Sequence, residues 1–177
     1  METKLYIMSR FFEDPDREFH IRELSRLTGI NHTTVRQNLN KLVKEGLLVL
    51  KKGKIISSYK IIFSRKYINL KLFYNLEKLR KSEIVENLQR YYDFPVIILF
   101  GSYAKSSDTI NSDIDISVIS NIKKEFNTSK YEKILNRKVT IHLFNKDRWK
   151  TAKKKNPELI NNICNGIVLS GELRVLE

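Results

Sequence analysis

The chain has 177 residues, of which 41% are hydrophobic and 30% charged, as expected of a folded protein with one large or two small domains. Its net charge of +13 favours a polyanionic partner, and its single cysteine excludes an intramolecular disulfide and a cysteine-rich zinc site. Because the sequence shows no apolar run long enough to cross a bilayer and no signal-peptide core, we expect a cytoplasmic protein that binds no membrane.

The first 65 residues have the pattern of three helices followed by a β-hairpin. Apolar spacing predicts a helix over residues 3–12 and a second helix from residue 21 that Gly29 closes. A third helix is expected after an Asn31 cap, ending at about residue 45 before Gly46. Alternating apolar residues predict strands at 47–50 and 55–62, joined by a tight turn at 51–54. We therefore expect one small domain over residues 1–65.

This order of elements resembles the winged helix-turn-helix family. The resemblance rests on the run from Arg22 to Arg36, RELSRLTGINHTTVR, and on the leucine spacing that follows it up to Gly46. It implies that the third helix enters the major groove of double-stranded DNA while the hairpin tip lies against phosphates. The residues expected to contact DNA are polar or basic, namely Asn31, His32, Thr33, Thr34, Arg36, Gln37, Asn40, Lys51, Lys52 and Lys54. The alternative is a module that binds protein.

Residues 66–81 are rich in helix formers and predict a helical connector between two domains. Their apolar stripe is interpreted as core within one molecule, with a dimer seam as the alternative. Ser82 is a candidate N-cap for a further helix, which would open the second domain over residues 82–177. A later helix of that domain is expected near residues 129–135.

The most informative stretch lies in this second domain. An apolar strand at residues 96–100 leads into Gly101-Ser102, and after ten further residues comes Asp113-Ile114-Asp115. Side chains two apart on a strand point the same way, so both carboxylates face one side, beside the Gly-Ser turn. Divalent cations such as Mg²⁺ often bridge one or two carboxylates to substrate phosphates, and a glycine allows close approach to a phosphate. The alternative is a surface loop followed by a strand with solvated aspartates.

The stretch resembles the DNA polymerase beta-type nucleotidyltransferase superfamily, and most closely its minimal members, over residues 82–177. The resemblance implies an α/β domain with a short mixed sheet, so the whole chain is expected to be α+β. It implies that Asp113 and Asp115 are catalytic and bind Mg²⁺ or Mn²⁺, and that a nucleoside triphosphate lies against Gly101, Ser102, Tyr103 and Lys105. In related minimal nucleotidyltransferases the acceptor can be a paired toxin protein, which makes a protein acceptor a candidate partner.

Two positions depart from the pattern of that superfamily. The third metal-binding acid is expected on the strand at residues 138–144, where Thr140 occupies its position and His142 points the same way. Ser106 stands where the motif usually has a glycine. Loss of a general base typically lowers a rate by about 10²–10⁴-fold, so nucleotide binding with poor transfer is expected.

Two functions follow from these patterns. The first is a DNA-binding protein that binds a Mg²⁺-nucleoside triphosphate and transfers a nucleoside monophosphate to a hydroxyl. The alternative is a catalytically degenerate transcription regulator, or an antitoxin-like repressor, whose nucleotidyltransferase-like domain is a sensor or scaffold. A homodimer is expected in either case, because winged helices commonly read two half-sites.

Overall fold

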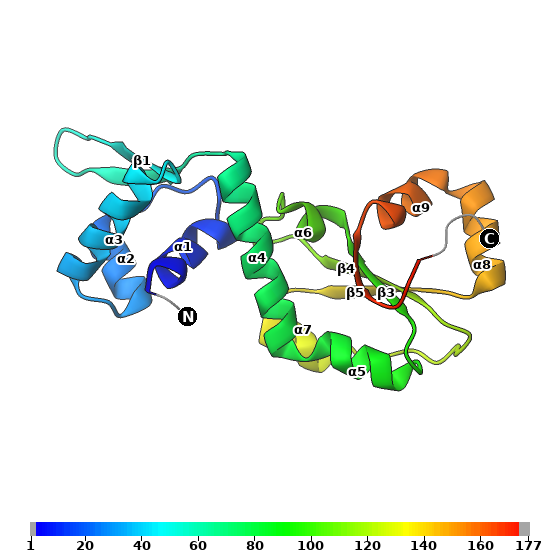
Figure 1. Cartoon of the computed structure of the whole chain (residues 1–177). Helices are drawn as coiled ribbons and strands as arrows, with labels where there is room; N and C mark the ends of the chain where they lie inside the picture. The colour runs from blue at the N-terminus through cyan, green and yellow to red at the C-terminus, as the bar shows by residue number, and fades with distance from the viewer. Residues whose placement is uncertain (1–2, 174–177) are drawn as a thin grey trace. The chain divides into compact units, whose positions relative to one another are not determined.

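The computed structural model describes residues 3–173 and divides into two compact units, Met1–Lys71 and Leu72–Glu177. Figure 1 shows the elements of both units along the chain. Helix α4 (Arg65–Ser82) contains the boundary between them, so the helix predicted for residues 66–81 is present. Within the described residues, no helix combines the length and the apolar character that a membrane span requires.

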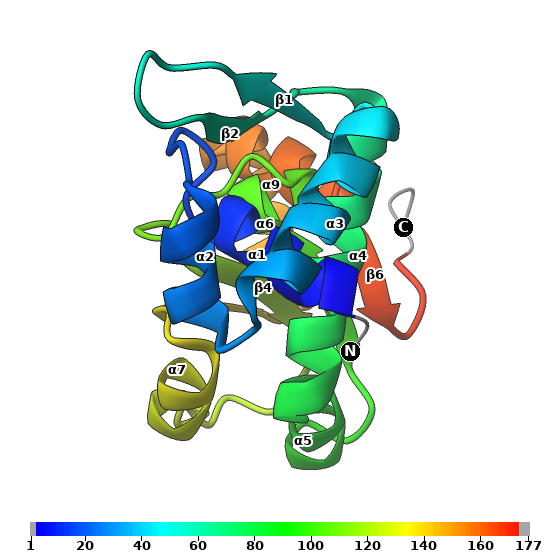
Figure 2. The same ribbon diagram turned by 90° about the vertical axis from the view of Figure 1, so that its left-hand side faces the viewer.

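The first unit contains three helices and a two-stranded hairpin (Figure 2), followed by the beginning of α4. The helices are α1 (Thr3–Glu13), α2 (Ile21–Thr28) and α3 (His32–Lys44), and the strands are β1 (Leu48–Lys51) and β2 (Ser58–Ile61). The core is formed by side chains with at most 1% exposure, among them Phe11, Leu24, Leu39 and Leu47. Within α3, the buried residues Val35, Leu39 and Leu42 recur at helical spacing, which is why such a helix could be predicted from periodicity.

The ends of α2 and α3 follow the residues that predicted them. Gly29 adopts a φ of 71°, a left-handed conformation that ends α2 at little cost for a residue without Cβ. The Asn31 side chain accepts a 2.8 Å hydrogen bond from the Thr34 amide and so caps α3. Both predicted caps are confirmed.

The hairpin differs from its prediction. Lys51 is the last residue of β1, and β2 begins only at Ser58, so a loop over residues 52–57 replaces the expected tight turn at 51–54. Ile55 and Ile56 suggested a strand by their apolar character, but their side chains are 94% and 61% exposed. Without a surface to cover them, apolar residues do not extend the strand.

The second unit is built on a four-stranded mixed sheet in the order β5-β4-β3-β6. Its strands are β3 (Val96–Phe100), β4 (Ile114–Ile119), β5 (Val139–Phe144) and β6 (Ile167–Ser170). β4 and β5 are parallel, whereas β3 is antiparallel to both β4 and β6. Its helices are α5 (Ile84–Tyr91), α6 (Gly101–Lys105), α7 (Ser129–Leu135), α8 (Lys146–Lys155) and α9 (Pro157–Cys164). The expected α+β class with a short mixed sheet is confirmed.

The N-cap of α5 lies one residue beyond Ser82, the residue predicted to fill that position. Glu83 occupies the N-cap position with a φ of 58°, while the Ser82 hydroxyl donates to the Leu79 carbonyl at 2.7 Å. The same hydroxyl lies 3.4 Å from the Ile84 amide. Ser82 therefore ends α4 and supports the bend, although it is not the N-cap itself.

Helices cover both faces of the sheet. On one face, Ile97, Leu99 and Ile116 pack in a cluster that includes Leu88 of α5 and Leu135 of α7. On the other face, a smaller cluster joins side chains of β3 and β5 to α8 and α9, namely Ile98, Phe100, Phe144, Trp149, Ile160 and Ile163. Because side chains alternate along a strand, a residue between Ile114 and Ile116 of β4 must face the α8–α9 side.

Candidate functional site

The Gly-Ser turn and the two aspartates lie together because β3 and β4 are antiparallel. Phe100, the last residue of β3, stands opposite Asp115 in the register, so the turn that follows β3 begins beside this carboxylate. Gly101 has a φ of 74°, and a Cβ built on it would lie 2.6 Å from Asp115 Oδ2. Both the backbone conformation and the space therefore require glycine here, because the Asp115 carboxylate occupies the place that a side chain would need.

Both carboxylates are partly open to solvent. The side chain of Asp113 is 41% exposed and that of Asp115 30% exposed, whereas Ile114 between them is fully buried. Lys138 Nζ lies 3.3 Å from Asp113 Oδ2, and His142 Nε2 lies 3.4 Å from Asp115 Oδ1. Each carboxylate thus lies near a side-chain nitrogen, one from the residue directly before β5 and one from β5 itself.

The parallel pairing of β4 and β5 determines what stands beside Asp115. Thr140 is its partner in the register, and His142 is the partner of Ser117. Thr140 and His142 share the α8–α9 face with Asp115, and the His142 ring lies 5.1 Å from the Phe100 ring. The position beside Asp115 is therefore held by a threonine, and the imidazole approaches the carboxylate instead.

The oxygen donors suit one divalent ion better than two. Within residues 3–173, no three His, Cys, Asp or Glu side chains are grouped so that they could hold a metal ion. Mg²⁺ is commonly bound by one or two carboxylates together with substrate phosphates and water, and Asp113 and Asp115 could supply the carboxylates. A pair of ions would leave one of them without a third carboxylate, so the donor set fits a single ion that bridges to a phosphate.

The four residues predicted to bind nucleotide differ in accessibility. Gly101 and Ser102 are half-buried at the start of α6, and Lys105 is exposed with its Nζ 3.4 Å from Asn162 Oδ1 of α9. Tyr103, however, is only 1% exposed, and its ring lies 5.6 Å from the Arg137 guanidinium. The ring of Tyr103 is therefore packed inside the second unit, and its contact with a nucleotide stays a prediction.

Ser106 ends α6 in a left-handed conformation, with a φ of 57° and a ψ of 24°. Its side chain is nearly buried, at 5% exposure. A left-handed conformation costs a residue with a Cβ roughly 1–2 kcal/mol, which gives a physical reason for a glycine at this position of the motif. The serine is compatible with the turn but strains it.

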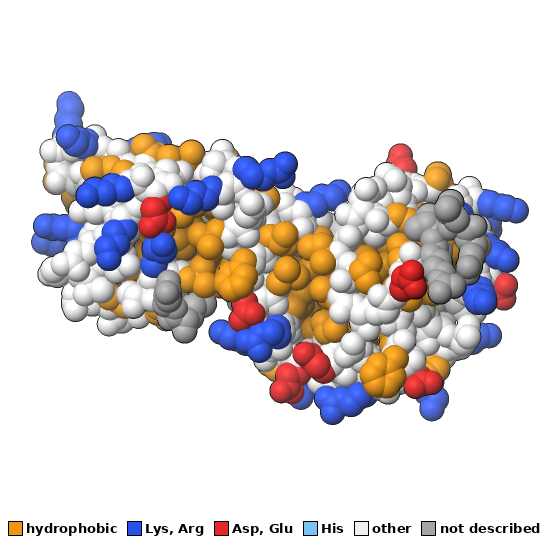
Figure 3. Space-filling view, viewed as in Figure 1, with side chains coloured by type: hydrophobic (Ala, Val, Ile, Leu, Met, Phe, Trp, Pro, Cys, Tyr) orange, Lys and Arg blue, Asp and Glu red, His pale blue; other side chains and the backbone are white. Residues whose placement is uncertain are grey.

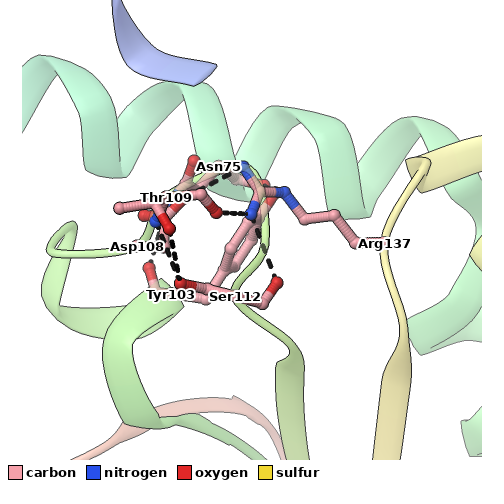
Figure 4. A network of polar contacts seen from close by, with 6 residues as sticks. All are labelled: Asn75, Tyr103, Asp108, Thr109, Ser112 and Arg137. Carbon is pink, nitrogen blue, oxygen red and sulfur yellow. Dashed lines mark hydrogen bonds and ion pairs between the residues drawn. The ribbon is translucent and has the colours of Figure 1, made fainter. Parts of the chain in front are cut away.

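A buried polar network connects the two halves of the motif (Figure 4). Asp108 and Arg137 form an ion pair at 3.3 Å, with side chains 1% and 2% exposed. Asn75 Nδ2 of α4 donates to Asp108 Oδ1 at 2.9 Å and to the Tyr103 carbonyl at 3.0 Å. Arg137 also donates to the backbone carbonyls of Thr109 and Ser112. The network holds the loop between the Gly-Ser turn and Asp113, and the sequence reasoning did not identify it.

The residues predicted to contact DNA lie in the first unit, along α3 and the hairpin. His32, Thr33, Arg36, Gln37 and Asn40 are exposed, and Thr34 is half-buried. Figure 3 shows Lys and Arg side chains spread over this unit and again at the α8 end of the second. The structure thus brings one group of candidates together on the exposed side of α3.

Two of the predicted DNA contacts already have partners within the protein. The Asn31 side chain caps α3, and Lys51 donates a hydrogen bond to Glu18. This hydrogen bond from Lys51 lowers the pKa of the Glu18 carboxyl, and a hydrogen bond from Ser58 adds a smaller effect in the same direction. Lys52 and Lys54 are exposed in the hairpin loop, so they are better placed than Lys51 to meet a phosphate.

Comparison with models of protein families matches residues 82–172 to the family described as "Polymerase beta, Nucleotidyltransferase". The matched range includes the Gly-Ser turn, both aspartates and all four strands of the second unit. Comparison with the curated proteins gave no match.

Proposed function

The chain belongs to the polymerase beta nucleotidyltransferase family, and from that premise we propose that it binds a nucleoside triphosphate with Mg²⁺ or Mn²⁺ and transfers the nucleoside monophosphate to a hydroxyl. The acceptor hydroxyl belongs to a partner protein or a small molecule. The observation that carries this proposal is the position of the Asp115 carboxylate, which stands opposite Phe100 and lies where a side chain at Gly101 would have to go.

In this proposal Asp113 and Asp115 hold the metal ion, and the backbone at Gly101 and Ser102 lies against the triphosphate. When bound, the ion neutralises phosphate oxygens and stabilises the charge that develops on the leaving pyrophosphate. Lys138 must leave Asp113 for this to occur. Its side chain is 69% exposed, so it can turn towards a phosphate without losing a buried contact.

Proton removal from the acceptor is the step for which the site is least equipped. Thr140 does not accept a proton near neutral pH as a carboxylate would. His142, whose Nε2 lies 3.4 Å from Asp115 Oδ1, is the candidate base in its place. We expect transfer slower by about 10²–10⁴-fold than with a carboxylate at position 140.

The same substitution favours a second candidate function. With Thr140 in place of an acid, the second unit would bind nucleotide without efficient transfer and act as a sensor or scaffold in a transcription regulator or antitoxin-like repressor. Nucleotide binding without measurable transfer would favour this second function.

We also propose that the first unit is a winged helix-turn-helix that binds double-stranded DNA, with the protein acting as a homodimer on two half-sites. Supporting this are the order of α2, α3 and the antiparallel hairpin, the exposed polar side of α3 and the lysines of the hairpin loop. Arg36 and Gln37 would face base edges in the major groove, while Lys52 and Lys54 would contact phosphates.

The metal site can be tested without knowledge of the acceptor. Electron paramagnetic resonance would measure how much Mn²⁺ the protein removes from solution in the presence of ATP. We expect tight Mn²⁺ binding by the wild-type chain and its loss in Asp113→Asn/Asp115→Asn. Asp16→Asn is the control, because Asp16 is an exposed acid in the other unit. Equal Mn²⁺ binding by all three proteins would refute the proposed site.

A further inference from the structure

Strand β5 forms an open edge of the sheet in the second unit, since the strand order places β4 on one side of it and no described strand on the other. The Lys138 and Phe144 carbonyls accept hydrogen bonds from the Ile114 and Ser120 amides, both at 2.9 Å. In a parallel ladder alternate residues turn their backbone groups to the neighbour. Those of Val139, Ile141 and Leu143 therefore point away from β4.

A groove of about 980 Å³ runs along this edge. All six residues of β5 line it, together with Asp147 and Arg148 of α8 at one end and Glu132 of α7 at the other. Since side chains from both faces of β5 line the groove, it follows the edge of the strand and does not lie over one face. The backbone of β5 is therefore accessible to another strand.

Two of the outward backbone groups are covered by charged side chains. The Val139 amide donates to Glu132 Oε1 at 3.0 Å, and the Leu143 carbonyl accepts from Arg148 Nη1 at 3.4 Å. A carboxylate thus covers one end of the edge and a guanidinium the other. Between them, the N–H and C=O of Ile141 have no hydrogen-bond partner within residues 3–173.

We propose that β5 pairs with β5 of a second copy of this chain, antiparallel about a two-fold axis at Ile141. In this register the two Ile141 residues exchange both backbone hydrogen bonds, and each Val139 lies opposite Leu143 of the second copy. The two four-stranded sheets join into one continuous sheet, and the open edge is removed from both molecules.

The charged side chains identify the occupant as a second copy. Antiparallel pairing brings Glu132 of one chain to Arg148 of the other, because these side chains cover the two groups that become bonded across the interface. The Val139 amide and the Leu143 carbonyl then bond directly, and the released carboxylate and guanidinium pair with each other. Every backbone group that loses a side-chain partner gains a backbone partner, and each released charge meets an opposite charge. A parallel arrangement would bring Glu132 against Glu132.

The pairing requires neither nucleotide nor DNA binding. Thr140 and His142 turn their side chains to the face that bears Asp115, whereas the second copy adds at the edge. The inference goes beyond the proposed function by giving the homodimer a defined interface. Its test measures only the self-association of the chain, so its outcome does not depend on nucleotide transfer.

Charge reversal in the full-length chain gives the sharpest test. Sedimentation velocity over a concentration series would give the dimer dissociation constant of the wild type, Glu132→Arg, Arg148→Glu and the double variant. We expect each single reversal to weaken the dimer at least about tenfold and the double variant to recover, since it restores opposite charges across the two-fold axis. Glu158→Arg, on the exposed side of α9, is the matched control and should leave the dimer unchanged.

A backbone variant tests the strand pairing itself. Ile141→Pro removes an outward N–H and no ladder bond to β4, a position where an edge strand accepts proline. Two hydrogen bonds are lost per dimer, so the dissociation constant should rise at least about tenfold, whereas Ile141→Val, which keeps the amide, should match the wild type. Circular dichroism would show that each variant is folded. A monomeric wild type, or a dimer equally tight in all variants, overturns the proposal.

Discussion

At the scale of single residues, the absence of a side chain at Gly101 leaves room for the Asp115 carboxylate beside the Gly-Ser turn. Gly101→Ala would place a Cβ 2.6 Å from Asp115 Oδ2 and force a left-handed backbone on a residue with a side chain. We expect a loss of roughly 1–3 kcal/mol in unfolding free energy and weaker Mn²⁺ binding, measured by urea denaturation and by electron paramagnetic resonance.

Gly29→Ala is the matched control for that variant. Gly29 has a φ of 71°, yet nothing lies within 4 Å of the point that its Cβ would occupy, so alanine there carries the backbone cost alone. Its Mn²⁺ affinity should equal that of the wild type. If Gly101→Ala bound Mn²⁺ as tightly as Gly29→Ala, the turn would have no part in positioning Asp115.

The threonine beside Asp115 allows a gain-of-function prediction. Thr140→Asp would place a third carboxylate on the face shared by Asp115 and His142. With ATP present, we expect the number of Mn²⁺ ions bound per chain to rise from one to two, because a second ion would gain the carboxylate it lacks. Thr140→Asn has nearly the same shape without the charge and should keep the stoichiometry at one. An unchanged stoichiometry in Thr140→Asp would contradict the assignment of position 140.

At the scale of elements, the Asp108–Arg137 pair holds the loop that leads into β4, and Asn75 connects this pair to α4 and α6. Arg137→Met would remove the guanidinium that pairs with the buried Asp108 carboxylate, and breaking a buried pair in this way typically costs about 3–5 kcal/mol. We expect a loss of this size in unfolding free energy by urea denaturation. Asp108→Asn/Arg137→Met should lose less than Arg137→Met alone, because the carboxylate charge that the guanidinium balances is removed together with it.

Local signals in the sequence were sufficient for most elements. The helix predicted near residues 129–135 is α7 with the same bounds, and the caps at Gly29 and Asn31 have backbone or side-chain geometry that those residue types favour. The hairpin was misjudged at Ile55 and Ile56, where apolar character alone was interpreted as a strand. Whether an apolar side chain is buried depends on which residues pack against it, and the periodicity of the sequence does not contain this information.

The part of the site made by residues close together in the sequence could be predicted, whereas the contacts between residues far apart in the sequence could not. The Gly-Ser turn and Asp113-x-Asp115 could be identified because one β-hairpin-like return brings them together. The ion pair of Asp108 and Arg137, and its link to Asn75, connect three distant positions that share no periodic pattern. Tyr103 contacts Asn75 and Arg137 of the same network, and for the same reason its burial could not be predicted from the sequence.

At the scale of the whole molecule, the net charge of +13 is consistent with a polyanionic partner, and α3 with the hairpin loop is the proposed contact surface. Fluorescence anisotropy with duplex DNA should show that Lys52→Ala/Lys54→Ala weakens binding to all sequences alike and lowers the salt slope by about one per lost phosphate contact. Arg36→Ala should instead reduce the preference among sequences. Lys133→Ala, an exposed lysine of α7, should leave binding unchanged. DNA affinity unaffected by any of these changes would contradict the proposed surface.

The central claim is that the acidic pair and the Gly-Ser turn form a working site for a metal-bound nucleoside triphosphate. The most direct measurement is calorimetric titration of the full-length chain with Mg²⁺-ATP and the other nucleoside triphosphates, alongside Asp113→Asn/Asp115→Asn. We predict saturable binding by the wild type that requires Mg²⁺ and disappears in the double variant. No binding by the wild type, or equal binding by both proteins, would contradict the claim.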